Sequence, residues 1–514
     1  MHRSVFRPRL GALTRRFAPG LILAFATSAS AAPAAAQRAF DPPTPTLLRG
    51  VQLELDGDPV SVLLDGGRIQ GVLGADAVLP PGAREVDGSG LLCLPAFHDA
   101  FTQEGLATPE PEAQADDPLD VRGDVRIDMR LANRKGIQPA FRGADASDLS
   151  DKALERYRKS GFGVALQAPT GELLGGKSVL VALREGALRD RIVRSEVHSH
   201  ADFDASGRGY PSTLMGYFSQ LRQFFSDAER HSQLQQRFDA GRPGPRPPFD
   251  PELDAGVELL KGRVLWCEAE SRRDLRRWYR LGDEFRLELG FVGGREAGDL
   301  AELLAERGTS VVLTLNWGEE PEDPREEDEE EVEGSEEPDE AQESEATAEA
   351  EEGEGDAEED EEDLSAWVYT EPEGVRLARR ERWERRRDAA QALQAAGVPF
   401  AFGTAGEKPG EVLGKVRDLV EAGLPREVAL LALTRVPARF AGLDGRLGQV
   451  AEGFDATVVL WDGDPLTDDK AEVRYLFVDG YAWDAESAID TGGDEDSDDR
   501  SNRAGEEVRQ EAKQ

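Results

Sequence analysis

The chain has 514 residues, and 61 Lys and Arg stand against 102 Asp and Glu, which gives a formal net charge of −41 at pH 7. This surplus of negative charge excludes duplex nucleic acid and anionic membranes as main partners. Two cysteines exclude a disulfide framework and a zinc ribbon, and five histidines leave few residues for a histidine-rich metal centre.

Residues 1–36 have the pattern of an export signal peptide. They hold five Arg and no acidic residue, then the apolar run 21–26, and end in three alanines at 34–36. The apolar run is too short to cross a bilayer, so we expect no integral membrane span in the mature chain. We therefore expect an exported protein of the periplasm or the extracellular space. Cys93 and Cys267 lie in strand-like apolar runs, and we expect both to be buried free thiols.

Short β strands are predicted near both ends of the chain. Alternating or apolar runs separated by Asp-Gly and Gly-Gly turns predict strands at residues 51–55, 60–64 and 68–73, and again at 456–461 and 473–478. We expect residues 45–92 and 441–484 to form one small composite β-sandwich domain.

Between these blocks, residues 93–440 alternate between strand and helix patterns. Strands are predicted at residues 91–97, 163–168, 179–183, 263–267, 287–292, 310–315 and 399–402, with amphipathic helices at 274–281, 299–307 and 379–396. This alternation is typical of parallel α/β folds, and it predicts a (β/α)8 TIM-type barrel.

Two segments are too polar to build a core. Residues 319–363 hold 28 Asp and Glu and one basic residue, Arg325, and they come directly after a predicted barrel strand. We expect this acidic insertion and the tail at 485–514 to be disordered. Runs of like charge usually only solvate the chain, although an acidic tether for cations or a basic partner stays an alternative.

Several motifs resemble the amidohydrolase superfamily, on its imidazolonepropionase-like branch. The resemblance spans roughly residues 47–482 outside the acidic insertion, and its most specific part is the return to the second β block. The motifs are VDGSG at 86–90, LPAFHDA at 94–100, YPSTLMG at 210–216, RLG at 446–448, DGDPL at 462–466 and VDG at 478–480.

The resemblance implies metal-dependent hydrolysis of non-peptide C–N bonds. One or two divalent metals, usually zinc, would activate water at the C-terminal mouth of the barrel. The family's ligands are a His-x-His on the first strand, single histidines on the fifth and sixth strands, and an Asp on the eighth strand that is also the general base.

When the family's ligand positions are carried over to this sequence one by one, most of them fall on residues whose side chains cannot bind a metal. They are Phe101, Gln103, Glu268, Gly293 and Ala405. We therefore expect no cofactor and no catalytic residue. The interpretation is a pseudoenzyme that binds a small ligand, or that forms a homo-oligomer or a hetero-oligomer with an active paralogue.

A second hypothesis keeps the chain an active hydrolase. Glu268 and Glu270 point the same way along a strand and could hold a hard cation together with Gln103 or Glu104. The simpler interpretation is a pair of rim carboxylates that face Arg272 and Arg273.

Three further patterns are weaker. His98 is out of phase with positions 101 and 103, so we expect a packing or surface histidine. His198 and His200 have ligand-like spacing, but an exposed strand or loop pair is the simpler expectation. Residues 171–178 fit the Walker A spacing, but the pattern after them is that of a strand rather than a helix, which speaks against phosphate binding.

Overall fold

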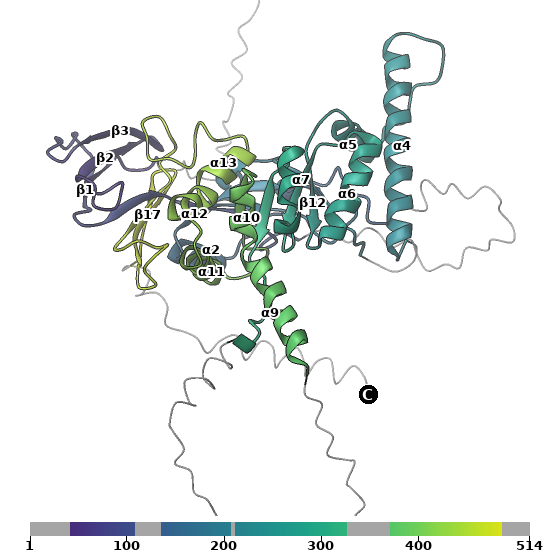
Figure 1. The fold of residues 1–514 in the computed structure, drawn as a ribbon. Coiled ribbons are helices and arrows are strands. Elements are labelled where there is room, and N and C mark those ends of the chain that lie inside the picture. The colour runs from purple at the N-terminus through teal and green to yellow at the C-terminus, as the bar shows by residue number, and fades with distance from the viewer. Residues whose placement is uncertain (1–41, 108–134, 207–210, 326–370, 486–514) are drawn as a thin grey trace, which may run out of the picture. The chain divides into compact units, whose positions relative to one another are not determined.

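The computed structural model describes residues 42–107, 135–206, 211–325 and 371–485 (Figure 1). The chain divides into two compact units, Met1–Pro42 and Pro43–Gln514, and every described helix and strand belongs to the second unit. The predicted export signal, most of the acidic insertion and all but the first residue of the tail lie outside the described residues. No helix within these ranges is long and apolar enough to span a membrane.

The N-terminal strands form a four-stranded sheet in the order β3-β2-β1-β4. Its strands are β1 (Thr46–Val51), β2 (Val60–Asp65), β3 (Arg68–Gly74) and β4 (Arg84–Asp87). The prediction of a strand at 51–55 was wrong, because β1 ends at Val51. A turn comes next, in which the Gly57 amide donates to the Glu54 carbonyl at 3.1 Å.

A second four-stranded sheet, in the order β18-β17-β16-β5, joins distant parts of the chain. Its strands are β5 (Leu92–Pro95), β16 (Val458–Trp461), β17 (Val473–Val478) and β18 (Tyr481–Asp484). Leu48 and Val62 of the first sheet share one buried cluster with Cys93, Val458 and Phe477 of the second. The two ends of the chain therefore meet in one core, and burial raises the pKa of the free Cys93 thiol to about 12.

The remaining strands form a four-stranded sheet, β10-β9-β7-β6, and a six-stranded sheet, β15-β14-β13-β12-β11-β8. Their bounds are β6 (Phe97–Thr102), β7 (Phe162–Gln167), β8 (Gly176–Lys177), β9 (Val179–Ala182), β10 (Ile192–Arg194), β11 (Ser199–Ala201), β12 (Leu265–Ala269), β13 (Leu289–Gly293), β14 (Val311–Thr314) and β15 (Phe400–Gly403). From β11 to β15 all neighbours are parallel.

These two sheets differ from the single closed parallel ring that the sequence predicts. The ribbon of β8 and β9 runs antiparallel to β11 on one side and to β7 on the other. At the opposite edge β15 lies beside β6, because the Ala405 amide donates to the Phe101 carbonyl at 2.9 Å. The observed architecture is a mixed α/β fold.

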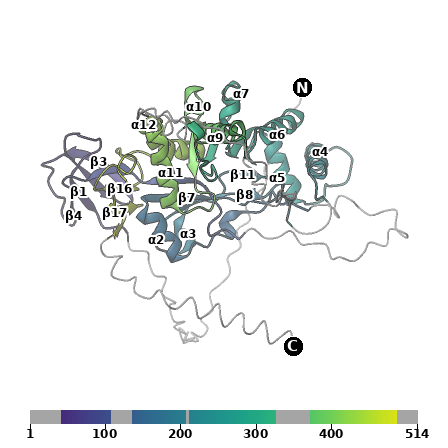
Figure 2. The same ribbon diagram turned by 60° about the horizontal axis from the view of Figure 1, so that its bottom comes forward.

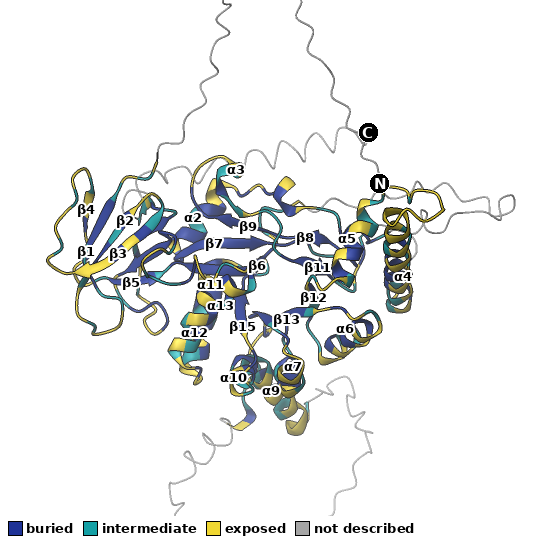
Figure 3. Cartoon of the chain, turned by 90° about the horizontal axis from the view of Figure 1, so that it is seen from above, coloured by how far each residue is buried: buried dark blue, intermediate teal, exposed yellow. Residues whose placement is uncertain are grey.

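The helices differ in how much of their surface is buried, as the colours in Figure 3 show. They are α2 (Asp151–Lys159), α3 (Leu188–Arg191), α4 (Leu214–Asp239), α5 (Pro251–Leu260), α6 (Arg272–Phe285), α7 (Ala301–Glu306), α9 (Glu373–Arg387), α10 (Ala389–Ala395), α11 (Pro409–Glu421), α12 (Arg426–Leu433) and α13 (Arg435–Phe440), with short 3-10 turns η1 (Gly143–Asp145) and η2 (Gly298–Leu300). Helix α2 packs against β7 and α11 (Figure 2).

Helix α6 illustrates how the sequence sets these elements. The Ser271 hydroxyl accepts from the Asp274 amide and caps the first turn, and Leu275, Trp278 and Leu281 lie on the buried face. The single helix predicted at 379–396 is instead two helices, α9 and α10, which break at Asp388.

Candidate functional site

A cavity of about 540 Å³ opens where β6, β12, β13, β14 and β15 end. All five positions at which the family resemblance places metal ligands line it: Phe101, Gln103, Glu268, Gly293 and Ala405. The structure therefore brings together residues that lie more than 300 positions apart in the sequence. Only one of the five, Glu268, carries a side chain that zinc commonly uses.

Phe101 makes its position apolar. Its side chain is 1% exposed and belongs to a buried cluster with Trp266 and Val292. Its ring lies 5.7 Å from the His200 ring, measured between centroids. The phenyl ring thus occupies space beneath the cavity, whereas Gln103, two residues on, is exposed at its rim.

Gly293 and Ala405 add no functional group to the cavity. Gly293 ends β13 with a φ of 99°, and a Cβ atom there would lie 2.7 Å from Oε1 of Glu270. A larger side chain at this position is therefore excluded while Glu270 keeps its place. Ala405 has a φ of 49° in the turn after β15.

Glu268 is the most perturbed carboxyl group of the cavity. Burial is the main cause that raises its pKa to about 9, and the neighbouring carboxylates Asp202 and Glu270 add to it. Its Oε1 atom is buried and has no hydrogen-bond partner. At neutral pH this group is therefore a protonated acid in the absence of a bound cation.

Glu270 forms an ion pair with an arginine of the chain. Its Oε2 lies 3.3 Å from Nε of Arg295, and its Oε1 accepts from the Thr314 hydroxyl at 3.4 Å. The expectation that Glu268 and Glu270 face Arg272 and Arg273 was wrong, because Arg272 lies against Asp299 and Arg273 is exposed.

Glu104 turns away from this cavity and does not line it. It forms an ion pair with Arg156 of α2 instead. Of the residues suggested for a rebuilt carboxylate site, Gln103, Glu268 and Glu270 come together and Glu104 does not.

Three further carboxylates of the wall come from segments that the sequence analysis did not connect with the site. Asp274 pairs with Arg277 at 2.6 Å, and Glu407 pairs with Lys415 at 2.6 Å. Asp202 is the third, and burial is the main cause that raises its pKa to about 6.

These side chains do not fit the divalent metal that the resemblance implies. Among the residues that the structure describes, no three His, Cys, Asp or Glu side chains are placed so that they could hold one metal ion. Phe101, Gly293 and Ala405 stand where the resemblance places ligands, and their side chains have no atom that could bind a metal.

Asp99 is a site residue that the sequence reasoning missed. It is 1% exposed, and it accepts hydrogen bonds from the Thr404 amide and hydroxyl, the Tyr157 hydroxyl and the Phe101 amide. Burial raises its pKa to about 6 against the effect of these donors. The signal that could have marked it is a carboxylate within the mostly apolar motif LPAFHDA at 94–100.

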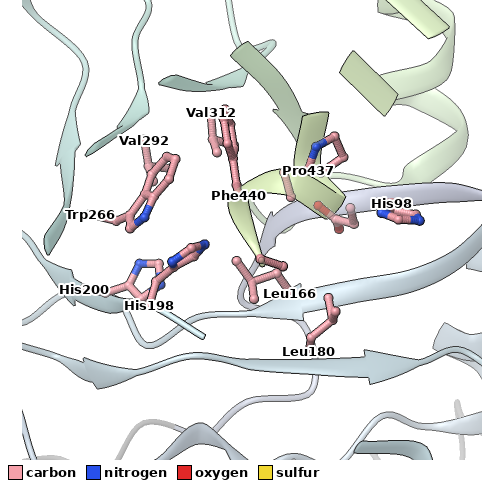
Figure 4. A pocket seen from close by; sticks show the side chains of 13 residues that line it. His98, Leu166, Leu180, His198, His200, Trp266, Val292, Val312, Pro437 and Phe440 are labelled. Atoms are coloured by element: carbon pink, nitrogen blue, oxygen red, sulfur yellow. The ribbon is translucent and has the colours of Figure 1, made fainter. Parts of the chain in front are cut away.

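A small enclosed cavity of about 10 Å³ lies deeper among the strands (Figure 4). His98, His198 and His200 line it, so the expectation that His198 and His200 are exposed was wrong. His200 is 2% exposed, neither ring nitrogen has a partner, and burial lowers its pKa to about 3. Burial likewise lowers the pKa of His98 to about 3, so all three rings pack as neutral groups.

The Walker A match at 171–178 does not open a helix. Lys177 lies in β8, and its ammonium group is 2.9 Å from Glu196 and 3.0 Å from Glu258. The strand predicted after this match is confirmed as β9.

Comparison with known proteins gives similarities to a family model, to a curated protein and to solved structures. The family model described as "Amidohydrolase family" matches residues 368–482. The curated amidohydrolase tasK of Hapsidospora irregularis is 45% identical over 60 residues, which is 12% of this chain and only 6% of that protein's length. A solved amidohydrolase from Thermotoga maritima superposes with a TM-score of 0.61 at 19% identity, over 85% of this chain and 99% of that chain.

A fourth similarity is to a solved prolidase complexed with n-methylphosphonate-l-proline. It has a TM-score of 0.46 at 19% identity, over 86% of this chain and all of that chain. The similarity to the Thermotoga structure shows the fold. Residues 368–482, which the family model matches, lie in the part of the chain that returns to the second β block.

Proposed function

We propose that this chain, which belongs to the amidohydrolase superfamily, is a catalytically degenerate member whose former active-site cavity binds a ligand. One observation carries the proposal. All five positions of the family's metal ligands line one cavity, and they hold Phe101, Gln103, Glu268, Gly293 and Ala405.

The loss of chemistry is a consequence of those side chains. Water attacks an amide at neutral pH only when a metal or a general base activates it. The eighth-strand position, where the resemblance places the base, is Ala405, and the described side chains of the cavity do not converge on a metal. The cavity is nevertheless retained at about 540 Å³, a volume that suits a small organic ligand.

The degenerate barrel is part of the same proposal. Parallel neighbours from β11 to β15, together with the backbone hydrogen bond from Ala405 to Phe101, support a (β/α)8 arrangement in which the β8–β9 ribbon has reversed direction. The shared core of the two outer sheets supports a composite β sandwich built from both ends of the chain.

Export and partnership are proposals from the sequence. The basic and apolar pattern of residues 1–36 supports transport to the periplasm or beyond. A protein that keeps a pocket without the reaction can act as a ligand-binding subunit, alone or beside an active paralogue.

The second candidate is an active hydrolase with a carboxylate site around Glu268 and Glu270. Both carboxylates line the cavity with Gln103, which favours it. Glu270 is already paired with Arg295 and Glu104 with Arg156, so two of its four residues are engaged elsewhere.

The deciding experiment is the metal content of the exported protein, purified without chelator and dialysed against zinc and manganese. We expect less than about a tenth of an equivalent, as for a site without converging ligands. Near-stoichiometric metal that is lost in Glu268→Gln, with the fold intact by circular dichroism, would establish the rebuilt site instead. Glu411→Gln, an exposed carboxylate paired with Lys408, is the matched control.

A further inference from the structure

The carboxylates that line the 540 Å³ cavity fall into two groups. Glu270, Asp274 and Glu407 each have a cation of their own, namely Arg295, Arg277 and Lys415. Asp202 and Glu268 form no ion pair with any of the described residues. They are therefore the two acidic groups of the wall that no Lys, Arg or His of the described residues pairs with.

Asp202 and Glu268 also act on one another. Asp202 is the strongest charged neighbour of Glu268, and the other charges that act on Glu268 are the carboxylates Glu270 and Asp204. The charges that act on Asp202 are likewise all carboxylates. The buried Oε1 of Glu268 has no hydrogen-bond donor among the described residues. A cavity wall with two acidic groups and no cation facing them among the described residues favours a ligand that carries a positive charge.

The rest of the wall suits an organic molecule. Phe203 lies beside Asp202 and is stacked on Trp278, with ring centroids 4.0 Å apart and planes 11° apart, so its face is held in place. Leu214 adds an apolar contact, while Thr314 and Asn316 add polar ones. A bare divalent ion would need about six oxygen ligands, and the described side chains do not converge on such a set.

We propose that the cavity binds an organic amine, whose protonated nitrogen is seated between Asp202 and Glu268 and whose apolar part lies along Phe203. This inference rests on the proposed function, because it assumes that the cavity is kept for a ligand. It names the class of that ligand. An ammonium group supplies up to three N–H donors and one positive charge, and a positive charge is what both Asp202 and Glu268 lack among the described residues.

The test compares amines with neutral molecules of the same shape. The probes are benzylamine, n-butylamine and phenethylamine, each paired with the corresponding alcohol, and binding to the exported protein is measured by calorimetry and thermal shift. We expect at least one amine to bind and its alcohol to bind about tenfold more weakly or worse. Asp202→Asn and Glu268→Gln should each weaken amine binding by about tenfold or more.

Glu411→Gln removes one exposed carboxylate and should leave amine binding unchanged, which separates the site from the overall negative charge. Equal binding of amine and alcohol, wild-type affinity in both cavity variants, or no binding by any of the three amines would each overturn the proposal.

The amine test and the metal test can be told apart by their outcomes. Stoichiometric zinc or manganese with turnover of an amide would overturn the proposed function, whatever the amines do. A metal-free, inactive protein that ignores all three amines would overturn only the ligand class.

Discussion

Thr404 donates two hydrogen bonds to Asp99, one from its backbone amide at 2.9 Å and one from its hydroxyl at 2.6 Å. Asp99 lies in β6 and Thr404 comes directly after β15, so this pair joins two strands that are 305 residues apart in the sequence. The pair also holds in place two nearby residues of the cavity wall, Phe101, two positions after Asp99, and Ala405, which follows Thr404.

Replacement of Asp99 tests this junction. Asp99→Ala leaves four buried donors without their acceptor, so we expect a loss of about 2–4 kcal/mol in the free energy of unfolding. Asp99→Asn keeps an acceptor for the two amides and should lose much less. Urea unfolding measures both, and a loss in Asp99→Ala no larger than in exposed Asp76→Asn would contradict the role.

The same carboxyl group gives a pH dependence. The folded-state pKa of Asp99 is raised to about 6, so the folded state binds the proton more tightly than the unfolded state. Its contribution to stability is therefore greatest below about pH 4 and is lost as the pH rises to about 6. Asp99→Asn does not titrate, and its unfolding free energy relative to wild type should rise across this window.

Glu268→Gln should stabilise the ligand-free protein at high pH. The pKa of Glu268 is raised from about 4.5 to about 9, so the wild-type protein loses stability as the pH rises through this interval. The Gln side chain is neutral throughout and avoids that loss. We expect a gain of about 1–3 kcal/mol near pH 9 and almost none near pH 4, measured by denaturant unfolding. An equal gain in Glu411→Gln would show a general charge effect instead.

Gly293→Ala should be destabilising for two separable reasons. The positive φ of 99° strains an alanine, and the new Cβ would lie 2.7 Å from Oε1 of Glu270. We expect a loss of about 1–3 kcal/mol in the free energy of unfolding. In the Glu270→Ala background the close approach is gone, so the loss should shrink without vanishing. An unchanged loss in that background would mean that backbone strain alone is responsible.

His200 and His231, two of the four buried histidines of the described residues, should respond to replacement in opposite ways. His200 is 2% exposed and has no hydrogen-bond partner, whereas His231 is 6% exposed and its Nε2 lies 3.0 Å from Asp254. His200→Leu removes two unpaired nitrogens and should leave stability unchanged or raise it by about 1 kcal/mol. His231→Leu should cost about 1–2 kcal/mol. A larger loss in His200→Leu, measured by thermal unfolding, would indicate a partner at the enclosed cavity.

The sequence was informative wherever local pattern decides the outcome. Every strand predicted between 91 and 402 overlaps an observed strand, because buried parallel strands are short apolar runs between turns. The break at Asp388 and the reversed β8–β9 ribbon were not predictable, since both depend on how neighbouring elements pack. The five positions at which the resemblance places metal ligands all line one cavity.

The sequence alone determined which residue types stand at those five positions, because the order of residues along the chain fixes the identity of each side chain. Only the tertiary structure decided which charges meet. It brought Asp202 and Glu268 into the wall of one cavity, paired Glu104 with Arg156 and Glu270 with Arg295, and buried His198 and His200. The physical reason is that ion pairs, burial and pKa shifts depend on distances between segments far apart in sequence, and packing alone sets those distances.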